Sequence, residues 1–300
     1  MKITLDEGFQ FGLGAFETIA VEAGKPIFLD KHLKRLERAA EFLYLGTLSE
    51  RGITEKQILR YLEEQAQLPE SRANFANITQ FSESRENFSD ITQFSESREN
   101  LANMMQFSES RENFSDITHC ALKIMLSKEN VVFSMRANPY TPERYEKGFV
   151  LDISPVKRNE TSSLVYHKTM NYGDCILEKR NAAAAGVDER LFLNTKDQIC
   201  EGTVSNIFFV KQGKLYTPDT RCGLLPGILR EYICETQHVE EVIIYPENLK
   251  EYEECFVTNS LMGIMPVRQI EETSFTEEKV TQTLLAKYQK LIANDVLFPK

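Results

Sequence analysis

Short apolar-rich runs near the start of the chain are followed by apolar residues that recur at helical spacing. Residues 16–22 and 25–29 flank a glycine turn and predict a β-hairpin. Asp30 then occupies the position of a helix cap, the apolar residues after it share one helical face, and Gly46 is placed to end the helix. The chain is therefore expected to begin with a hairpin and a helix.

A second helix and a second hairpin follow from the same kind of pattern. Thr54 and Gln57 form a capping-box pattern at the start of a helix that runs through Leu62. Residues 121–126 and 130–135 are apolar runs on either side of a short polar turn, and they predict two more strands. The first half of the chain thus mixes strands and helices.

A stretch that contains two prolines, residues 138–142, is the expected linker between two domains. A boundary near Pro139 divides the chain into a small domain at 1–138 and a larger one at 139–300. In the second part, strands are predicted at 150–156, 190–193, 207–210, 214–217, 239–245 and 255–258, and helices at 174–185, at 227–236 and after Ser274. This order of elements predicts an α+β chain.

One segment departs from the globular pattern. Residues 71–118 repeat with a period of 13, in copies that begin at Ser71, Ser84 and Ser97 and a truncated copy at Ser110. The apolar positions in each copy are compatible with a weak helical stripe, whereas the many Ser, Asn and Asp residues favour turns, so helix and disorder both remain open. The segment is an interaction module or an insertion in a surface loop, and we favour the insertion because a longer surface loop adds little closure entropy.

Composition limits the classes of protein that fit. The 300 residues are 42% hydrophobic and 27% charged, which is typical of a globular protein. A formal net charge of −10 disfavours nucleic acids and anionic membranes as partners.

The first residues form no apolar signal region and no run is long enough to span a membrane, so a cytoplasmic protein is expected. Six scattered cysteines and four isolated histidines predict free thiols and no metal site.

Three separated motifs carry the candidate chemistry. Lys168 lies in Val-Tyr-His-Lys-Thr-Met-Asn-Tyr, and 33 positions later Glu201 begins Glu-Gly-Thr-Val-Ser-Asn. Residues 224–230 then read Leu-Leu-Pro-Gly-Ile-Leu-Arg. These supply an amine for the aldehyde of pyridoxal phosphate, a carboxylate for its ring nitrogen, and a glycine turn before a helix for its phosphate. Together the motifs predict an enzyme that uses this cofactor on a small-molecule substrate.

Each motif alone has an ordinary structural explanation. Most lysines are solvated, so Lys168 would be read as part of a strand edge, and Glu201 fits a surface turn equally well. The glycine turn alone would indicate a plain loop before a helix. Their occurrence together is what favours a cofactor site.

With these motifs in view, the chain resembles the fold-type IV pyridoxal-phosphate enzymes. That group holds branched-chain aminotransferases, D-amino acid aminotransferases and aminodeoxychorismate lyases, and the chain is most similar to the lyases. The match covers nearly all of the sequence except residues 71–118. The resemblance implies a small N-terminal α/β domain that carries the repeat insertion, a larger C-terminal pseudo-barrel domain, and a homodimer whose active sites lie close to the subunit interface.

The resemblance also assigns roles to residues. It implies that Lys168 bonds to the cofactor, that Glu201 pairs with the ring nitrogen, and that Arg35, in His-Leu-Lys-Arg-Leu, holds the phosphate. Many relatives have threonine where this chain has Leu229, so only backbone contacts remain there. The implied catalytic residues are Lys168 and Thr18, and the implied cofactor-binding residues are Arg35, Lys168, Tyr172, Glu201, Ser205, Asn206, Leu225, Gly227, Ile228, Leu229 and Ser260.

Two short patterns favour the lyases within this group. Thr18 follows a Phe-Glu pair where branched-chain aminotransferases tend to have glycine, although Thr18 also fits an ordinary strand residue. Asn259-Ser260-Leu261 likewise resembles the lyases. Against this, the arginine-containing loop that helps receive substrate carboxylates in relatives is here the short turn at 127–130, which leaves Lys128 or Arg136 as candidates for that role.

Three hypotheses about function follow. The first is a lyase that converts 4-amino-4-deoxychorismate to 4-aminobenzoate, a folate precursor, and pyruvate. The second is an aminotransferase of branched-chain or D-amino acids. The third is a protein that binds the cofactor, or interacts through its repeat, without catalysis; the intact Lys168, Glu201 and Arg35 disfavour it.

Overall fold

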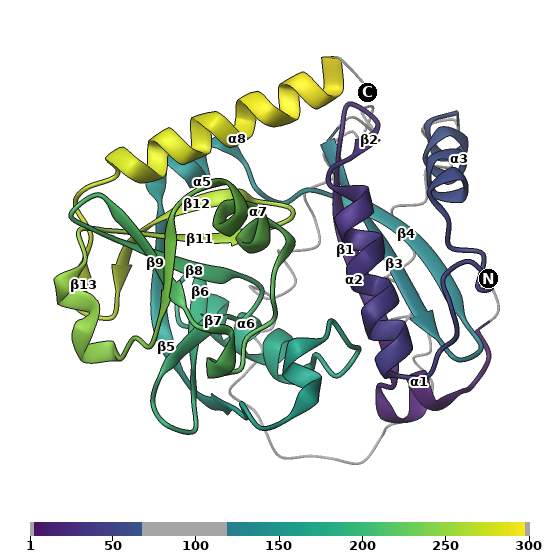
Figure 1. Ribbon diagram of the computed structural model, residues 1–300, viewed down its shortest axis with the longest axis horizontal. Helices are drawn as coiled ribbons and strands as arrows, with labels where there is room; N and C mark the ends of the chain where they lie inside the picture. Colours follow the sequence, from purple (N-terminus) through teal and green to yellow (C-terminus); the bar gives the residue numbers. More distant parts are fainter. Residues whose placement is uncertain (1–2, 68–118, 298–300) are drawn as a thin grey trace, which may run out of the picture.

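The computed structural model describes residues 3–67 and 119–297 of the chain. Its strands form two sheets, a small one near the N-terminus and a larger, curled one in the C-terminal part (Figure 1). The mixed α+β content predicted from the sequence is confirmed. The repeat predicted at 71–118 lies outside the described residues.

The small sheet has four antiparallel strands in the order β2-β1-β3-β4. They are β1 (Gly14–Glu22), β2 (Lys25–Pro26), β3 (His119–Ser127) and β4 (Val131–Ala137). Helix α2 (Leu29–Phe42) packs on one face of this sheet, so that its apolar stripe is buried against alternate residues of β1 and β3. The buried core includes Ile19, Leu36, Ala40, Leu122 and Ile124.

Helix α2 begins and ends differently from the prediction. Asp30 was expected as the cap, but Phe28 occupies the N-cap position and Asp30 lies in the first turn, where its negative charge suits the helix dipole. The predicted strand at 25–29 is correspondingly shorter, because the chain already turns into the helix. The helix stops at Phe42 before Gly46, since Tyr44 adopts a left-handed conformation with φ of 55°.

Two shorter helices complete the N-terminal part. Helix α1 (Glu7–Phe11) was not predicted, and helix α3 (Glu55–Ala66) was. The predicted cap of α3 is confirmed, because the Gln57 backbone N–H donates to Thr54 Oγ1 at 3.3 Å. Ile58 and Leu62 of this helix are buried against the same core as α2.

The larger sheet runs in the order β10-β9-β8-β11-β12-β5-β6-β7, with β13 paired to β12. Its strands are β5 (Phe149–Arg158), β6 (Glu189–Asn194), β7 (Ile199–Gly202), β8 (Asn206–Lys211), β9 (Lys214–Pro218), β10 (Val239–Val242), β11 (Glu254–Asn259), β12 (Gly263–Ile270) and β13 (Thr273–Ser274). Strands β7, β12 and β13 were missed by the sequence analysis. Strand β12 is buried along most of its length and contains Pro266, so it lacks the alternating pattern that marks a strand.

Short helices connect these strands, and a long one covers them. They are α5 (Pro142–Lys147), η3 (Ser163–Tyr166), α6 (Gly173–Ala184), η4 (Thr220–Cys222), α7 (Ile228–Thr236), η5 (Pro246–Glu251) and α8 (Lys279–Leu297). Helix α8 lies along one side of the molecule (Figure 1), and its Leu284 and Tyr288 pack with Phe208 and Phe256 of the sheet. Within the described ranges, no helix is long and apolar enough to cross a membrane.

Direct contacts join the two parts of the chain. Lys31 of α2 forms an ion pair with Glu235 of α7 at 2.8 Å. Asn138 donates from Nδ2 to the carbonyl of Leu261 at 2.9 Å. These contacts hold helix α2 against helix α7 and the end of strand β4 against the turn between β11 and β12. The domain boundary near Pro139 stays a prediction, although the small sheet ends at Ala137 and the larger one starts at Phe149.

The packing of α2 yields a stability prediction. Leu36 is 1% exposed in the core beneath α2, whereas Leu59 on α3 is 37% exposed. Leu36→Ala is expected to lower the free energy of unfolding by about 2–5 kcal/mol, because a buried leucine loses both its transfer free energy and its packing. Leu59→Ala is the matched control, with an expected change within roughly 0.5 kcal/mol. If urea unfolding shows that both variants lose the same free energy of unfolding, the apolar stripe of α2 is not buried as described.

Candidate active site

A cavity of about 460 Å³ lies where the small sheet meets the larger one. Residues from β1, β3, β4, α2, β5, β7, β8, β11 and the turn before α7 line it. All the catalytic and cofactor-binding residues implied by the resemblance are on its wall: Thr18, Arg35, Lys168, Tyr172, Glu201, Ser205, Asn206, Leu225, Gly227, Ile228, Leu229 and Ser260. Of the two candidates for binding substrate carboxylates, Arg136 lines the cavity and Lys128 does not. The fold therefore brings three distant motifs to one place.

Lys168 is held beside strand β1 by backbone pairing. The N–H of Phe16 donates to the carbonyl of Lys168 at 3.0 Å, and the N–H of Met170 donates to the carbonyl of Gly14 at 2.7 Å. The Lys168 ammonium lies 4.6 Å from the centroid of the Phe16 ring and 5.1 Å from that of Tyr172. Burial, together with the nearby Arg35 charge, lowers the pKa of Lys168 to about 8. A substantial share of this amine is therefore unprotonated in mildly alkaline solution.

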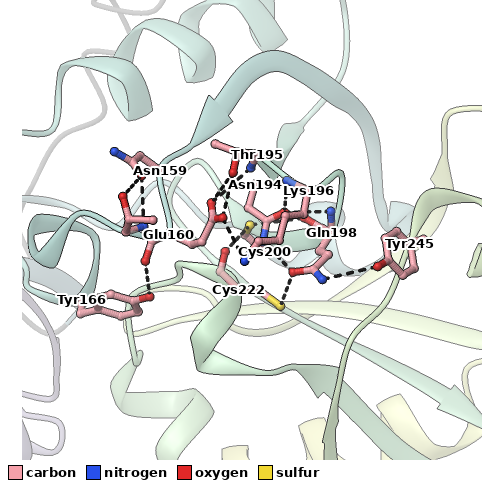
Figure 2. A network of polar contacts seen from close by, with 11 residues as sticks. Asn159, Glu160, Tyr166, Asn194, Thr195, Lys196, Gln198, Cys200, Cys222 and Tyr245 are labelled. Carbon is pink, nitrogen blue, oxygen red and sulfur yellow. Dashed lines mark hydrogen bonds and ion pairs between the residues drawn. The ribbon is translucent and has the colours of Figure 1, made fainter.

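A polar network fixes the loop that precedes Lys168 (Figure 2). The Tyr166 hydroxyl donates to the carbonyl of Glu160 at 2.7 Å, and the Glu160 carboxylate accepts from the hydroxyl of Thr195 at 2.8 Å. Hydrogen bonds to Thr195 lower the pKa of Glu160 to about 2, so this anchor is ionised. Gly223 packs against Glu160 in a left-handed conformation with φ of 91°, and a Cβ there would lie 2.8 Å from Glu160 Cα.

The same network extends to the strand that carries Glu201. Cys200 Sγ contacts the carbonyl of Cys222 at 3.0 Å, and Cys222 Sγ contacts Gln198 Oε1 at 3.7 Å (Figure 2). Strand β7 and the turn after η4 are thus tied together next to the cavity. Both thiols are buried and are free cysteines.

Glu201 is buried in strand β7, not in the surface turn that its sequence context also allowed. Its Oε1 forms an ion pair with Arg158 at 2.5 Å, and its Oε2 accepts from the N–H of Leu225 at 3.1 Å. Burial raises the pKa of Glu201, and the Arg158 charge opposes that effect. Arg158 was missed by the sequence analysis, because the strand predicted at 150–156 stops short of it and a lone arginine after a strand gives no signal by itself.

Arg35 lies in a buried ion-pair cluster with Glu17 and His32. Its Nε and one terminal nitrogen each donate to the Glu17 carboxylate at 2.7 Å, and the other terminal nitrogen donates to the carbonyl of Pro226 at 3.2 Å. His32 Nδ1 is 2.7 Å from the same carboxylate. Although burial alone would raise the pKa of Glu17, the Arg35 charge and the hydrogen bonds from Arg35 and His32 hold it well below its ordinary value. Arg35 is therefore no surface charge, and its remaining N–H groups are available to the cavity.

The turn before α7 contains a glycine that lets the backbone pass close to the Asn206 side chain. Asn206 Nδ2 donates to the carbonyl of Leu225 at 2.9 Å, and a Cβ on Gly227 would lie 2.1 Å from Asn206 Oδ1. Any larger residue at position 227 would have to displace the Asn206 side chain from this hydrogen bond. Helix α7 then starts at Ile228 without a side-chain cap, so its first N–H groups remain available to an anion.

The hydroxyl groups on the wall differ in their partners. Tyr172 donates to the carbonyl of Thr203 at 3.1 Å, and Ser205 Oγ is 3.5 Å from Glu189 Oε2. Ser260 follows strand β11 and lines the cavity. Thr258 Oγ1, which the sequence analysis missed, is buried and has no hydrogen-bond partner among the described residues.

The chemistry of these groups fits a phosphorylated aldehyde that contains a ring nitrogen. The cavity offers an amine of lowered pKa, a buried carboxylate held by an arginine, an uncapped helix start and an unpartnered hydroxyl. In the parts of the chain that are described, no group of three or more His, Cys, Asp or Glu side chains is placed to hold a metal ion. These are the groups that an enzyme dependent on pyridoxal phosphate needs.

The chain belongs to the amino-transferase class IV family, whose model matches residues 14–270. It is 27% identical to the aminodeoxychorismate lyase of Bacillus subtilis over 96% of this chain and 89% of that protein. It is 34% identical to the probable branched-chain-amino-acid aminotransferase of Thermotoga maritima, over 50% of this chain and 57% of that protein. The crystal structure of 4-amino-4-deoxychorismate lyase from Pseudomonas aeruginosa shares the fold, with a TM-score of 0.67, 22% identity, and coverage of 97% and 95% of the two chains.

The Glu17 cluster predicts a large loss of stability when its carboxylate is neutralised. Glu17→Gln leaves the buried Arg35 without a counter-charge, which is expected to lower the free energy of unfolding by about 3–5 kcal/mol. Glu22→Gln on the same strand removes only an exposed pair with His119, so its expected effect is below about 1 kcal/mol. If denaturant unfolding shows that Glu17→Gln and Glu22→Gln both lower the free energy of unfolding by less than about 1 kcal/mol, the Glu17 carboxylate is not a buried charge paired with Arg35.

The lowered pKa of Lys168 predicts a specific pH dependence. Only the unprotonated amine is nucleophilic, so labelling of Lys168 by a small acylating reagent should rise with pH through a midpoint near pH 8. Peptide mass spectrometry after brief labelling of the cofactor-free protein measures that midpoint. A midpoint near the ordinary value of 10.5 would show that Lys168 lies in a solvated environment.

Proposed function

We propose that this protein is a pyridoxal-phosphate-dependent lyase that converts 4-amino-4-deoxychorismate to 4-aminobenzoate and pyruvate. The observation that supports it most is that the Lys168 amine shares one cavity with Glu201, Arg35 and the start of α7. Lys168 and Thr18 are the proposed catalytic residues. The cofactor would be held by Arg35, Tyr172, Glu201, Ser205, Asn206, Leu225, Gly227, Ile228, Leu229 and Ser260, together with Lys168.

The proposed chemistry assigns one task to each polar group. When bound, pyridoxal phosphate supplies an electron sink for the carbon that carries the substrate amine. Lys168 accepts the proton from that carbon, which its lowered pKa allows near neutral pH. Glu201, held by Arg158, keeps a proton at the ring nitrogen. Loss of the proton and expulsion of the neighbouring enolpyruvyl group as enolpyruvate leave 4-aminobenzoate. The enolpyruvate takes up a proton and becomes pyruvate.

The aromatic side chains at Lys168 support proton transfer at this position. The rings of Phe16 and Tyr172 lie edge to face with centroids 5.1 Å apart, and both border the ammonium group. They limit its contact with water, which favours the neutral amine. Thr18, two residues along β1 from Phe16, brings a hydroxyl to the same wall.

A lyase is favoured over an aminotransferase by the extent of the sequence alignment and by two local patterns. The alignment with the Bacillus subtilis lyase spans nearly the whole chain, whereas that with the Thermotoga maritima aminotransferase spans half. Thr18 and the Asn-Ser-Leu run at Asn259 follow the lyase pattern. The higher identity of the aminotransferase, 34%, keeps transamination of branched-chain or D-amino acids as the second candidate. A homodimer in the cytoplasm that serves folate synthesis completes the proposal.

The reaction is tested by product analysis of the purified protein loaded with pyridoxal phosphate. We expect pyruvate and 4-aminobenzoate from aminodeoxychorismate without a keto-acid acceptor, and none from Lys168→Ala. The same protein is assayed for transamination of D-alanine and of branched-chain amino acids with 2-oxoglutarate. Rapid transamination with no 4-aminobenzoate would replace the lyase with the second candidate.

A further inference from the structure

We propose that His167 is a positioning residue, which holds the Lys168 amine in place through a ring stack with Phe42 at the end of helix α2. The inference rests on the proposed function, because it takes Lys168 as the reactive amine. It concerns a contact between the two parts of the chain that the sequence analysis did not anticipate.

The His167 and Phe42 rings lie face to face. Their centroids are 4.0 Å apart and their planes are 5° from parallel. Phe42 is the last residue of α2, and His167 immediately precedes Lys168. Both residues are partly buried. The stack therefore joins the helix of the small sheet directly to the segment that carries the amine.

The imidazole of His167 is also fixed on its own side of the stack. Its Nδ1 donates to the carbonyl of Ser163, at the start of η3, over 3.0 Å. The backbone N–H of His167 donates to the carbonyl of Leu164 at 3.3 Å. The ring cannot turn away from Phe42 without breaking the first of these hydrogen bonds, so the position of Phe42 is passed to the backbone next to Lys168.

The stack anchors the side of Lys168 that the strand pairing leaves out. The hydrogen bonds to β1 are made by the Lys168 carbonyl and the Met170 N–H, which both follow the Lys168 Cα along the chain. His167 holds the backbone that precedes this Cα. Anchors on both sides of one Cα fix the direction in which its side chain leaves the backbone.

Helix α2 connects this anchor to the residue proposed to hold the cofactor phosphate. Arg35 and Phe42 are seven positions apart, so they share a face of the helix and lie about 10 Å apart along its axis. On that face, Arg35 donates to the carbonyl of Pro226 at 3.2 Å. The stack therefore sets the Lys168 amine at a defined place relative to the Arg35 guanidinium, and these two groups would meet the aldehyde and the phosphate of one cofactor.

A second cavity, of about 490 Å³, lies beside the stack. Its wall includes His167, Arg38 of α2 and Cys234 of α7, and it shares Arg35 and Pro226 with the neighbourhood of the phosphate site. Close packing fixes the distance between two elements, whereas open space does not. The stack thus has a positional role here that close packing would otherwise share.

Labelling of Lys168 by a small acylating reagent in the cofactor-free protein tests the positioning role. The unmodified protein should show a midpoint near pH 8. His167→Ala and Phe42→Ala should each raise the midpoint by about one pH unit, because a side chain that is no longer held gains contact with water and moves away from the Arg35 charge. The double variant should raise it no further, since both residues act through one contact.

His167→Phe and Tyr44→Ala are the controls. Phenylalanine at 167 keeps a flat ring on Phe42, so the midpoint should stay near pH 8. Tyr44, two positions after Phe42, is 91% exposed, and its loss should leave the midpoint unchanged. The positioning role is wrong if His167→Ala and Phe42→Ala, folded by circular dichroism, keep the midpoint of the unmodified protein. It is equally wrong if Tyr44→Ala or His167→Phe shifts the midpoint as much as His167→Ala does.

Product analysis of the loaded protein separates this inference from the proposed reaction. A midpoint that depends on the stack, in a protein that forms no 4-aminobenzoate from aminodeoxychorismate, would keep the positioning role and overturn the reaction. Formation of 4-aminobenzoate by a protein whose midpoint does not depend on the stack would keep the reaction and overturn the positioning role.

Discussion

Two backbone hydrogen bonds between strand β1 and the segment of Lys168 determine how the cavity is assembled. They join Phe16 to Lys168 and Gly14 to Met170, so the reactive amine is attached to the small sheet although its chain belongs to the larger part. Glycine suits position 14 in this strand, since a Cβ there would lie 2.8 Å from the backbone carbonyl oxygen of Leu126 on β3 and 2.6 Å from the Met170 sulfur. This pairing holds the Lys168 ammonium beside the Phe16 and Tyr172 rings, where burial and the Arg35 charge lower its pKa.

The distribution of charge around the cavity separates structural from binding roles. Carboxylates of the protein engage Arg35 and Arg158, and these contacts fix each guanidinium group in place. Lys168 has no such partner among the described residues, so its amine can respond to a ligand. The overall charge of the chain is negative, yet the cavity is positive. A cavity of this kind concentrates small anions in a protein that repels large polyanions.

The sequence predicted most of what a local pattern can encode. Lys168, Glu201 and the glycine turn were recognisable because their residue types and order imply one chemistry, and the fold does place them on one cavity wall. Arg158 and His167 could not be recognised, because each is an ordinary polar residue until the tertiary structure shows what it contacts. The start of α2 was misplaced because an aromatic residue, Phe28, adopts the left-handed conformation that a cap prediction does not anticipate. Strand β12 was not predicted, because burial on both faces removes the alternation of apolar and polar residues on which strand prediction depends.

The central claim is that Lys168 is the amine that meets the cofactor in this cavity. Incubation with pyridoxal phosphate, reduction with borohydride and mass spectrometry of the digested protein measure it directly. The account predicts that the added mass resides on the peptide containing Lys168 and disappears from it in Lys168→Ala. A label that resides instead on another lysine of the wall, such as Lys123 or Lys179, would contradict the assignment of the site.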